Sequence, residues 1–140
     1  GEDVMRKLLI LIRESGRKWE MDQIEQVSFL PEACEQAKDL EEFYALLDQN
    51  EGHFKAIYDD AKAEEAQLRV VASFKDGVAK VGLEKVQKSH PFYFLEGKDN
   101  IVLFHTDRYQ EQPLVVKGAG AGAEVTASGI FADVLRIANQ

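Results

Sequence analysis

The stretch that decides the fold class is LRVVASFKDGVAKVGLEKV, residues 68–86. Apolar and polar residues alternate on both sides of Lys75-Asp76-Gly77, and Asp-Gly favours the tight turn of a β-hairpin. The pattern therefore predicts two antiparallel strands, residues 68–74 and 78–86. Further strands are predicted at residues 24–29, 101–107 and 114–117.

Helical spacing of apolar residues and end signals predict helices on both sides of these strands. Residues 3–15 begin with acidic side chains and are followed by Gly16, a typical helix stop. A capping box at residues 39–42 opens the next helix. The remaining helices are expected at residues 51–67 and 124–138. This order predicts an α+β domain with one mixed sheet of about four strands and helices mainly on one face.

Length and composition place the chain among globular proteins with a single domain spanning residues 1–140. It is 45% apolar and 30% charged, with a formal net charge of −8. This negative charge argues against nucleic acid and anionic membranes as partners. The longest apolar run, residues 8–12, is far shorter than the ~20 residues of a membrane span.

The cysteine and histidine content argues against disulfides and metals. A lone cysteine, Cys34, cannot form an internal disulfide and fits the reducing cytoplasm. Its position beside helix signals favours a small core residue over a nucleophile. The three histidines have no metal-ligand spacing. We therefore expect no metal and a cytoplasmic location.

A glycine-rich turn, Gly118, Gly120 and Gly122, joins a predicted strand to the last predicted helix. Such a turn lets a backbone lie against a phosphate or a flat cofactor ring. The pattern G-x-G-x-x-A is present, but no second strand or ribose-binding acidic residue follows, so it is no ordinary dinucleotide-binding unit. Alternatively, the glycines let the last helix pack closely on the sheet.

Asp3 and Lys7 are four residues apart at the head of the first predicted helix and share a face. One interpretation is an ordinary surface ion pair, which is common on helices. The other is a catalytic lysine that moves a proton on a substrate hydroxyl while the carboxylate holds the substrate. Spacing alone leaves both open. His90, before Pro91, fits a loop residue better than a base.

Both ends of the chain resemble one family. Residues 1–7, Gly-Glu-Asp-Val-Met-Arg-Lys, are similar to the second half of the homoserine dehydrogenase signature, G-x-D-x-x-x-K. The stretch 97–100, the residues 113–115 and the turn 118–122 resemble the C-terminal part of that family. So does the run from Val125 to Asp133. The resemblance covers essentially the whole chain.

The resemblance implies an NAD(P)-dependent oxidoreductase that interconverts L-aspartate 4-semialdehyde and L-homoserine. It implies that Lys7 is the general acid/base, that Asp3 binds homoserine, and that Gly122 lies against NADP or NAD near the nicotinamide. It also implies an α+β catalytic domain like that of glyceraldehyde-3-phosphate dehydrogenases, which contributes to a homodimer.

The family's dinucleotide fingerprint and further substrate ligands would precede Gly1. We therefore expect a catalytic and dimerisation domain that lacks its N-terminal nucleotide-binding domain and is inactive alone. The chain ends soon after residues 131–133 with no appended regulatory domain, which resembles the bifunctional aspartokinase–homoserine dehydrogenases, although short single-function forms end similarly. The alternative is a stand-alone dimerisation or ligand-binding module that has the same fold and no catalysis.

Overall fold

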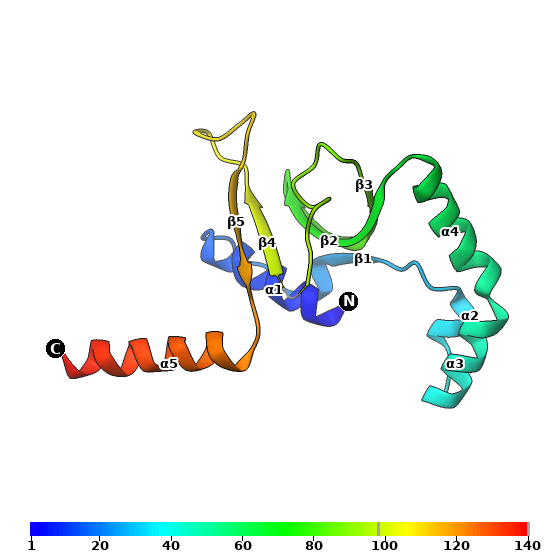
Figure 1. Ribbon diagram of the computed structural model, residues 1–140, viewed down its shortest axis with the longest axis horizontal. Coiled ribbons are helices and arrows are strands. Elements are labelled where there is room, and N and C mark those ends of the chain that lie inside the picture. The colour runs from blue at the N-terminus through cyan, green and yellow to red at the C-terminus, as the bar shows by residue number, and fades with distance from the viewer. Residues whose placement is uncertain (98, 140) are drawn as a thin grey trace. The chain divides into compact units, whose positions relative to one another are not determined.

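The structure, a computed structural model, describes residues 1–97 and 99–139. These form two compact units. Unit 1 comprises Gly1–Tyr93, and unit 2 comprises the described residues from Phe94 onward. Helices and a mixed sheet occur in the chain (Figure 1), so the predicted α+β class is confirmed.

Unit 1 is built on a three-stranded sheet with the order β1-β3-β2. Strand β1 (Ile24–Val27) runs parallel to β3 (Val78–Val86), and β2 (Gln67–Lys75) runs antiparallel to it. At the turn between β2 and β3, Asp76 and Gly77 have φ angles of 52° and 78°. Two consecutive positive φ angles are those of a type I′ turn, so the predicted hairpin and its turn are confirmed.

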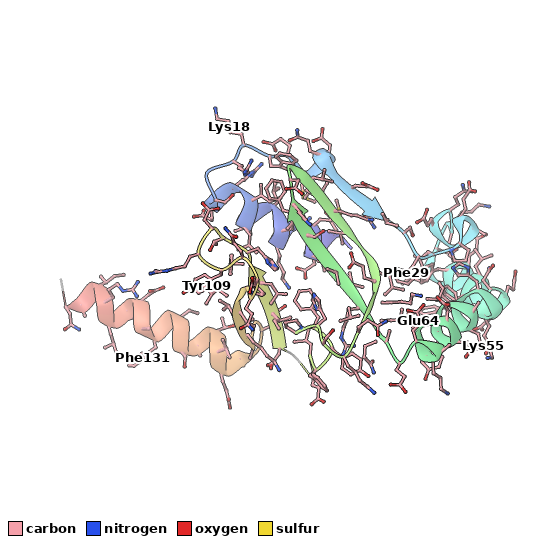
Figure 2. The ribbon with its side chains drawn as sticks, turned by 90° about the horizontal axis from the view of Figure 1, so that it is seen from above. Lys18, Phe29, Lys55, Glu64, Tyr109 and Phe131 are labelled. Carbon is pink, nitrogen blue, oxygen red and sulfur yellow. The ribbon has the colours of Figure 1, made fainter. Side chains whose placement is uncertain are left out.

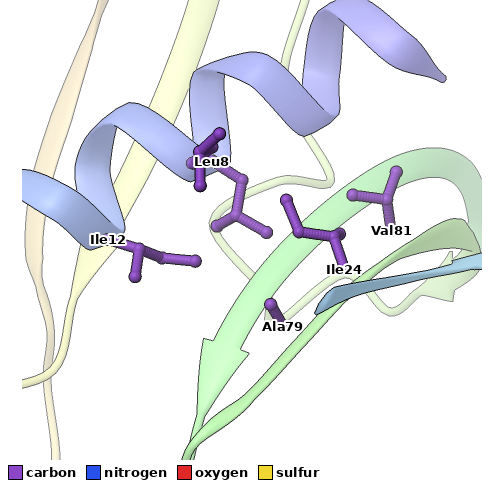
Figure 3. Packing of buried hydrophobic residues seen from close by; sticks show 6 residues of the cluster. Leu8, Ile12, Ile24, Ala79 and Val81 are labelled. Atoms are coloured by element: carbon purple, nitrogen blue, oxygen red, sulfur yellow. The ribbon is translucent and has the colours of Figure 1, made fainter. Parts of the chain in front are cut away.

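The core of unit 1 lies between helix α1 (Glu2–Glu14) and one face of this sheet. From α1, Leu8, Leu9 and Ile12 belong to the buried cluster, and Leu8 and Ile12 point toward the strands. They meet Ile24 of β1 and Ala79 and Val81 of β3 (Figure 3). Val4 and Met5 are partly buried against the same cluster, so the apolar residues of α1 lie three to four positions apart on one helix face.

The segment between β1 and β2 is helical and carries the net negative charge of the chain. It contains α2 (Glu32–Glu35), α3 (Leu40–Gln49) and α4 (Glu51–Ala63), which lie together at one side of unit 1 (Figure 1). Residues 32–65 contain eleven acidic and three basic residues, so they account for the entire net charge of −8. The other residues are electrically balanced.

The helix starts and ends in this segment follow local chemistry. The Asp39 carboxylate accepts the Glu42 N–H at 2.8 Å, which caps α3 as predicted. In a complete capping box the Glu42 carboxylate would accept the Asp39 N–H. Here it accepts the Lys38 N–H instead, at 2.8 Å. Helix α4 ends before the predicted residue 67, since Glu65 has a φ of 54°. The short helix α2 had no sequence prediction.

Ion pairs attach the C-terminal end of α4 to β3. The Lys85 ammonium of β3 pairs with Asp60 at 2.9 Å and also with Glu64, which lies at the end of α4 near the sheet (Figure 2). Lys88, just after β3, pairs with Glu65 at 2.7 Å. Hydrogen bonds to Glu64 and then Asp60 raise the pKa of Lys85, and the hydrogen bond to Glu65 raises that of Lys88. The hydrogen bond from Lys88 lowers the pKa of Glu65.

These pKa shifts predict the pH range in which the ion pairs between the end of α4 and the β3 region contribute to stability. The Glu65 contribution is present above its ordinary value of 4.5 and is lost as the pH falls through its lowered pKa. The Lys85 and Lys88 contributions are present below 10.5 and are lost as the pH rises through their raised pKa values. We expect NMR signals of Ala61, which is buried in α4, to shift below pH 4.5 and above pH 10.5.

A pair of lysine variants tests whether these bonds attach the helix. Lys85→Met removes two contacts between α4 and β3, and we expect amide exchange within α4 to become about two- to five-fold faster. Lys55 pairs with Asp59 inside α4, so Lys55→Met removes a contact that does not reach the sheet. Equal exchange in the two variants would contradict the attachment.

Unit 2 contains a two-stranded ladder and the last helix. Strand β4 (Asp99–Phe104) pairs antiparallel with β5 (Leu114–Ala119), and α5 (Ala123–Ala138) follows. The prediction of one sheet with about four strands therefore needs correction: the described residues form five strands in two sheets, with three and two strands. The predicted strands at 101–107 and 114–117 pair with each other because their sequences form a long hairpin.

Helix α5 forms as predicted but is largely exposed. None of its described residues is buried, and the side chain of Phe131 projects from the helix (Figure 2). Stability of a helix in proteins comes mainly from packing of an apolar face. The exposed large apolar side chains of α5 are Val125, Ile130, Phe131, Val134, Leu135 and Ile137.

Candidate functional site

Asp3 and Lys7 form an ion pair at the N-terminal end of α1. The Lys7 Nζ lies 2.9 Å from the Asp3 Oδ2, and the two residues are four positions apart along the helix. The predicted shared face is therefore confirmed. Both side chains are solvent-exposed, at 78% for Asp3 and 58% for Lys7. In this chain the pair has the geometry of a surface ion pair, and its two charged groups are accessible to a ligand.

A second ion pair on α1 has the same spacing. Arg6 donates to the Glu2 carboxylate at 2.6 Å, also four residues apart. Because the pairs Glu2–Arg6 and Asp3–Lys7 have equal spacing and similar exposure, spacing alone cannot distinguish a catalytic pair from a structural one. The neighbouring pair is a natural control for experiments on Lys7.

The glycine at the start of the signature lies beside β1. A Cβ built on Gly1 would lie 2.8 Å from the side-chain amide nitrogen of Gln26, a residue of β1. A larger residue at position 1 would displace only the end of this flexible side chain. The Gly1 carbonyl also accepts the Met5 N–H at 3.0 Å, which starts the helix.

The three glycines of the turn between β5 and α5 differ in their surroundings. A Cβ on Gly120 would meet the Asn100 amide nitrogen at 1.7 Å, so a side chain there would displace Asn100 of β4. Gly122 has a φ of 141°, which L-amino acids rarely adopt, and the space beside it is open. Gly118 also borders open space. Helix packing thus explains neither Gly118 nor Gly122 within the described structure.

The turn offers two features that a ligand can use. Gly122 is the residue before the first turn of α5, where backbone N–H groups point out of the helix and suit a phosphate. No neighbouring atom lies within 4 Å of the position of a Cβ on Gly122, so the backbone is accessible from that side and leaves room for a flat ring such as nicotinamide.

The other candidates behave as structural residues. Cys34 is buried, as expected for a small core residue. His90 lies in a loop, where its Nδ1 accepts the Phe92 N–H at 3.2 Å. Within the described ranges, no three His, Cys, Asp or Glu side chains gather in a way that could hold a metal ion. Likewise, no described helix has the length and apolar character needed to cross a membrane.

Two hollows of unit 1, formed by described residues, are lined by residues other than Asp3 and Lys7. One of about 280 Å³ is lined by Tyr58, Lys62 and Tyr93, among others. Another of about 240 Å³ borders Lys85 and His90. Ligand pockets usually enclose about 300–1,000 Å³. The exposure of the Asp3 and Lys7 side chains places the pair on the open surface of unit 1.

Sequence reasoning did not anticipate two residues that shape these surroundings. Asn100 lies against Gly120, and Arg69 binds the backbone of the loop that ends unit 1. Asn100 stands next to Asp99 in a stretch that resembled the family, which was the one available signal. The neighbouring Lys98 lies outside the described residues. Arg69 had no signal, because it occupies an ordinary polar position of a strand.

The sequence of the chain is similar to those of known proteins. The family model described as homoserine dehydrogenase matches residues 1–135. A bifunctional aspartokinase/homoserine dehydrogenase 2 of Zea mays, described as chloroplastic, is 42% identical over 99% of this chain and 15% of its own length. A homoserine dehydrogenase of Schizosaccharomyces pombe is 41% identical over 100% of this chain and 38% of its own.

A solved structure extends the similarity to the fold. A crystal structure of a protein of unknown function from Candida auris has a TM-score of 0.83 and 39% sequence identity. The similarity covers 99% of this chain and 39% of that one. Such agreement supports a dehydrogenase-like α+β architecture.

The chain belongs to the homoserine dehydrogenase family, because the family model covers almost all of it and several relatives share about 40% of its residues. It spans between 15% and 38% of the length of the two relatives described above. The resemblance seen in the terminal motifs is thereby confirmed.

Proposed function

We propose that the chain is the catalytic and dimerisation domain of an enzyme that interconverts L-aspartate 4-semialdehyde and L-homoserine with NADP or NAD. The observation that carries the proposal is the Asp3–Lys7 pair, joined at 2.9 Å within the family's signature. An ammonium and a carboxylate on one exposed face match a substrate that carries both a carboxylate and an amino group. The pathway would be the synthesis of threonine and methionine.

In this proposal Lys7 handles the proton of the reaction. When the aldehyde is reduced, a hydride bonds to the carbonyl carbon, the C=O π electrons move to oxygen, and the ammonium of Lys7 donates a proton to that oxygen. The reverse reaction returns the proton to the Lys7 amine by the same path. The nicotinamide cofactor supplies or accepts the hydride. General acid/base groups of this kind contribute about 10²–10⁴-fold in rate.

Asp3 and Gly122 have positioning roles in the proposal. The Asp3 carboxylate binds the substrate amino group and holds the reacting carbon close to Lys7. The open backbone at Gly122 lies beside the nicotinamide ring, where a Cβ would occupy the space of the ring. Hydride transfer requires this near-attack geometry. An N-terminal nucleotide-binding domain in the parent enzyme would hold the rest of the cofactor.

We further propose a cytoplasmic homodimer that is part of a larger bifunctional chain with an aspartokinase region. The support is the family membership, the bifunctional relatives and the buried free thiol of Cys34. Sedimentation velocity of the chain at micromolar concentration tests the dimer. A single species at the monomer mass, 15.8 kDa, would contradict it.

The direct test is homoserine-dependent reduction of NADP and NAD, followed at the absorbance of the reduced nicotinamide. We expect no turnover by the folded chain alone. We expect turnover when the chain replaces its matched region, at 41% identity, in the Schizosaccharomyces pombe homoserine dehydrogenase. Turnover by the chain alone would contradict the need for an N-terminal domain.

The second candidate function is a module with the same fold and no catalysis. The exposure of the Asp3–Lys7 pair is the observation that favours it, because surface ion pairs of this spacing are common without function. A correctly folded replacement protein with no turnover would support this candidate over the enzyme.

A further inference from the structure

Asn100 of β4 lies beside the glycine-rich turn of unit 2. In the β4–β5 ladder it stands opposite Gly118, while its neighbour Asp99 stands opposite Ala119. Side chains alternate between the two faces of a ladder, so Asn100 is on the same face as positions 118 and 120. Residues diagonally opposite on one face can touch when a side chain leans along the strand. Gly120 is in this diagonal position relative to Asn100.

The two glycines on this face differ in the space beside them. The position of a Cβ on Gly118 is open within the described structure. The position of a Cβ on Gly120 lies 1.7 Å from the Asn100 amide nitrogen and 2.8 Å from the Asn100 Cγ. The Asn100 side chain therefore leans toward Gly120 and fills the place of a side chain there. Since Gly120 has no positive φ, it is this lack of space that excludes a side chain at position 120.

The turn continues from this contact to the start of α5. Gly122 follows two residues later, with a φ of 141° and no atom of the described structure within 4 Å of its Cβ position. The Gly122 carbonyl accepts the Thr126 N–H at 3.1 Å, which begins the helix. Glycine has more accessible backbone conformations than other residues. A contact at Gly120 therefore limits the conformations of a segment that is flexible by composition.

We propose that Asn100 is a positioning residue for the glycine-rich turn. Its side chain packs against Gly120 and restricts the backbone to the conformation in which one side of Gly122 is open to a ligand. The contact is one of shape, because the Asn100 amide faces the side of Gly120 where any other residue would carry its side chain. Asn100, Gly120 and Gly122 all belong to unit 2, so the contact lies within one unit.

The consequence of this contact for catalysis rests on the proposed function. In that proposal the nicotinamide ring lies beside Gly122, and a turn that samples several conformations holds the ring less precisely. A displacement of about 1 Å at a reacting group can lower a rate by ~10²-fold. Asn100 acts on the reaction through the turn and not on the reacting atoms.

Nuclear magnetic resonance of the full chain tests the positioning with no ligand or activity required. We expect a nuclear Overhauser effect between the Asn100 side-chain amide and the α-protons of Gly120. Asn100→Ala should lower the backbone order parameters of residues 120–122 from about 0.85 to about 0.6 or less. Asn100→Leu should keep them high, because leucine is also branched at Cγ. Unchanged order parameters in Asn100→Ala would overturn the proposal.

Asp99→Ala is the matched control. Asp99 has nearly the size of Asn100 and is next to it in β4, but it lies on the other face of the ladder. There its carboxylate is 3.7 Å from the Lys117 ammonium. Loss of the Asp99 side chain should leave the order parameters of residues 120–122 unchanged. An equal decrease in Asp99→Ala and Asn100→Ala would mean that the ladder is weakened as a whole, which would overturn the specific role of Asn100.

A double-mutant cycle in the replacement enzyme tests the catalytic consequence. We expect Asn100→Ala to lower kcat/KM for NADP or NAD about ten-fold and to change the KM for homoserine by less than about two-fold. Gly120→Ala should have a similar effect, because its methyl group displaces the Asn100 side chain. The double variant should lose no more than either single variant, since both changes remove one contact. Additive losses would overturn the shared role of these residues.

The two measurements separate this inference from the proposed function. A replacement protein without turnover contradicts the proposed function, and the order parameters of the chain still decide whether Asn100 positions the turn. Rigid residues 120–122 in Asn100→Ala, together with an active replacement enzyme, contradict the inference and leave the proposed function intact.

Discussion

Replacing Lys7 by methionine should lower kcat by about 10²–10⁴-fold in the active replacement enzyme. The physical reason is that methionine keeps the length and apolar stem of lysine but has no proton to donate to the substrate oxygen. The pair with Asp3 at 2.9 Å is lost at the same time. Because Lys7 is more than half exposed, we expect the fold to be unaffected, which circular dichroism checks. The rate is measured as homoserine-dependent formation of NADPH or NADH.

Arg6→Met is the matched control for Lys7. Arg6 is on the same helix turn and pairs with Glu2 at the same spacing, with comparable exposure. Loss of this pair should change kcat less than two-fold, since surface pairs contribute little. Similar kcat values for Lys7→Met and the unsubstituted enzyme would rule out Lys7 as the proton donor. A similar large loss in both variants would indicate that α1 is damaged generally.

Replacing Ile12 by alanine should destabilise unit 1 by about 2–5 kcal/mol. Ile12 is only 2% exposed and lies between α1 and the sheet, so its loss leaves a cavity in a small core. The free energy of unfolding of a small domain is about 5–15 kcal/mol, so much of it would be lost. Urea unfolding followed by far-UV circular dichroism measures the change as a lower midpoint.

Ile10→Ala controls for the loss of helix propensity and of an apolar side chain. Ile10 is on the outer face of α1 and is 59% exposed. We expect a change of about 0.5 kcal/mol or less. If both alanine variants had the same midpoint as the unsubstituted chain, the core between α1 and the sheet would be incorrectly assigned.

Local sequence signals predicted the elements of this fold well. The Asp76-Gly77 turn, the Asp39 cap and the first helix, predicted at residues 3–15 and observed at Glu2–Glu14, depend on chemistry within a few residues, which the sequence displays directly. The end of α4 was misplaced because Glu65 adopts a positive φ without being glycine or asparagine. No local sequence pattern predicts a positive φ at a glutamate.

Pairing between distant segments was harder to predict. The sequence displayed strands but not which of them share a sheet, and β4 and β5 pair with each other in unit 2. The site was predictable to the extent that it is local: Asp3 and Lys7 are four residues apart, and Gly122 directly precedes a helix. The contacts of Gly120 with Asn100 and of Arg69 with Tyr93 join residues 20 or more positions apart. Such contacts need the three-dimensional structure.

The concentration of negative charge in residues 32–65 affects the electrostatic interaction of the molecule with other ions. A chain whose entire net charge of −8 resides in one helical segment has a large electric dipole moment. At physiological ionic strength the field of that segment decays over about 8 Å. An anion that approaches the balanced remainder of the surface therefore meets little long-range repulsion. An anion-exchange matrix would hold the molecule by α2, α3 and α4, and leave the rest of it facing the solution.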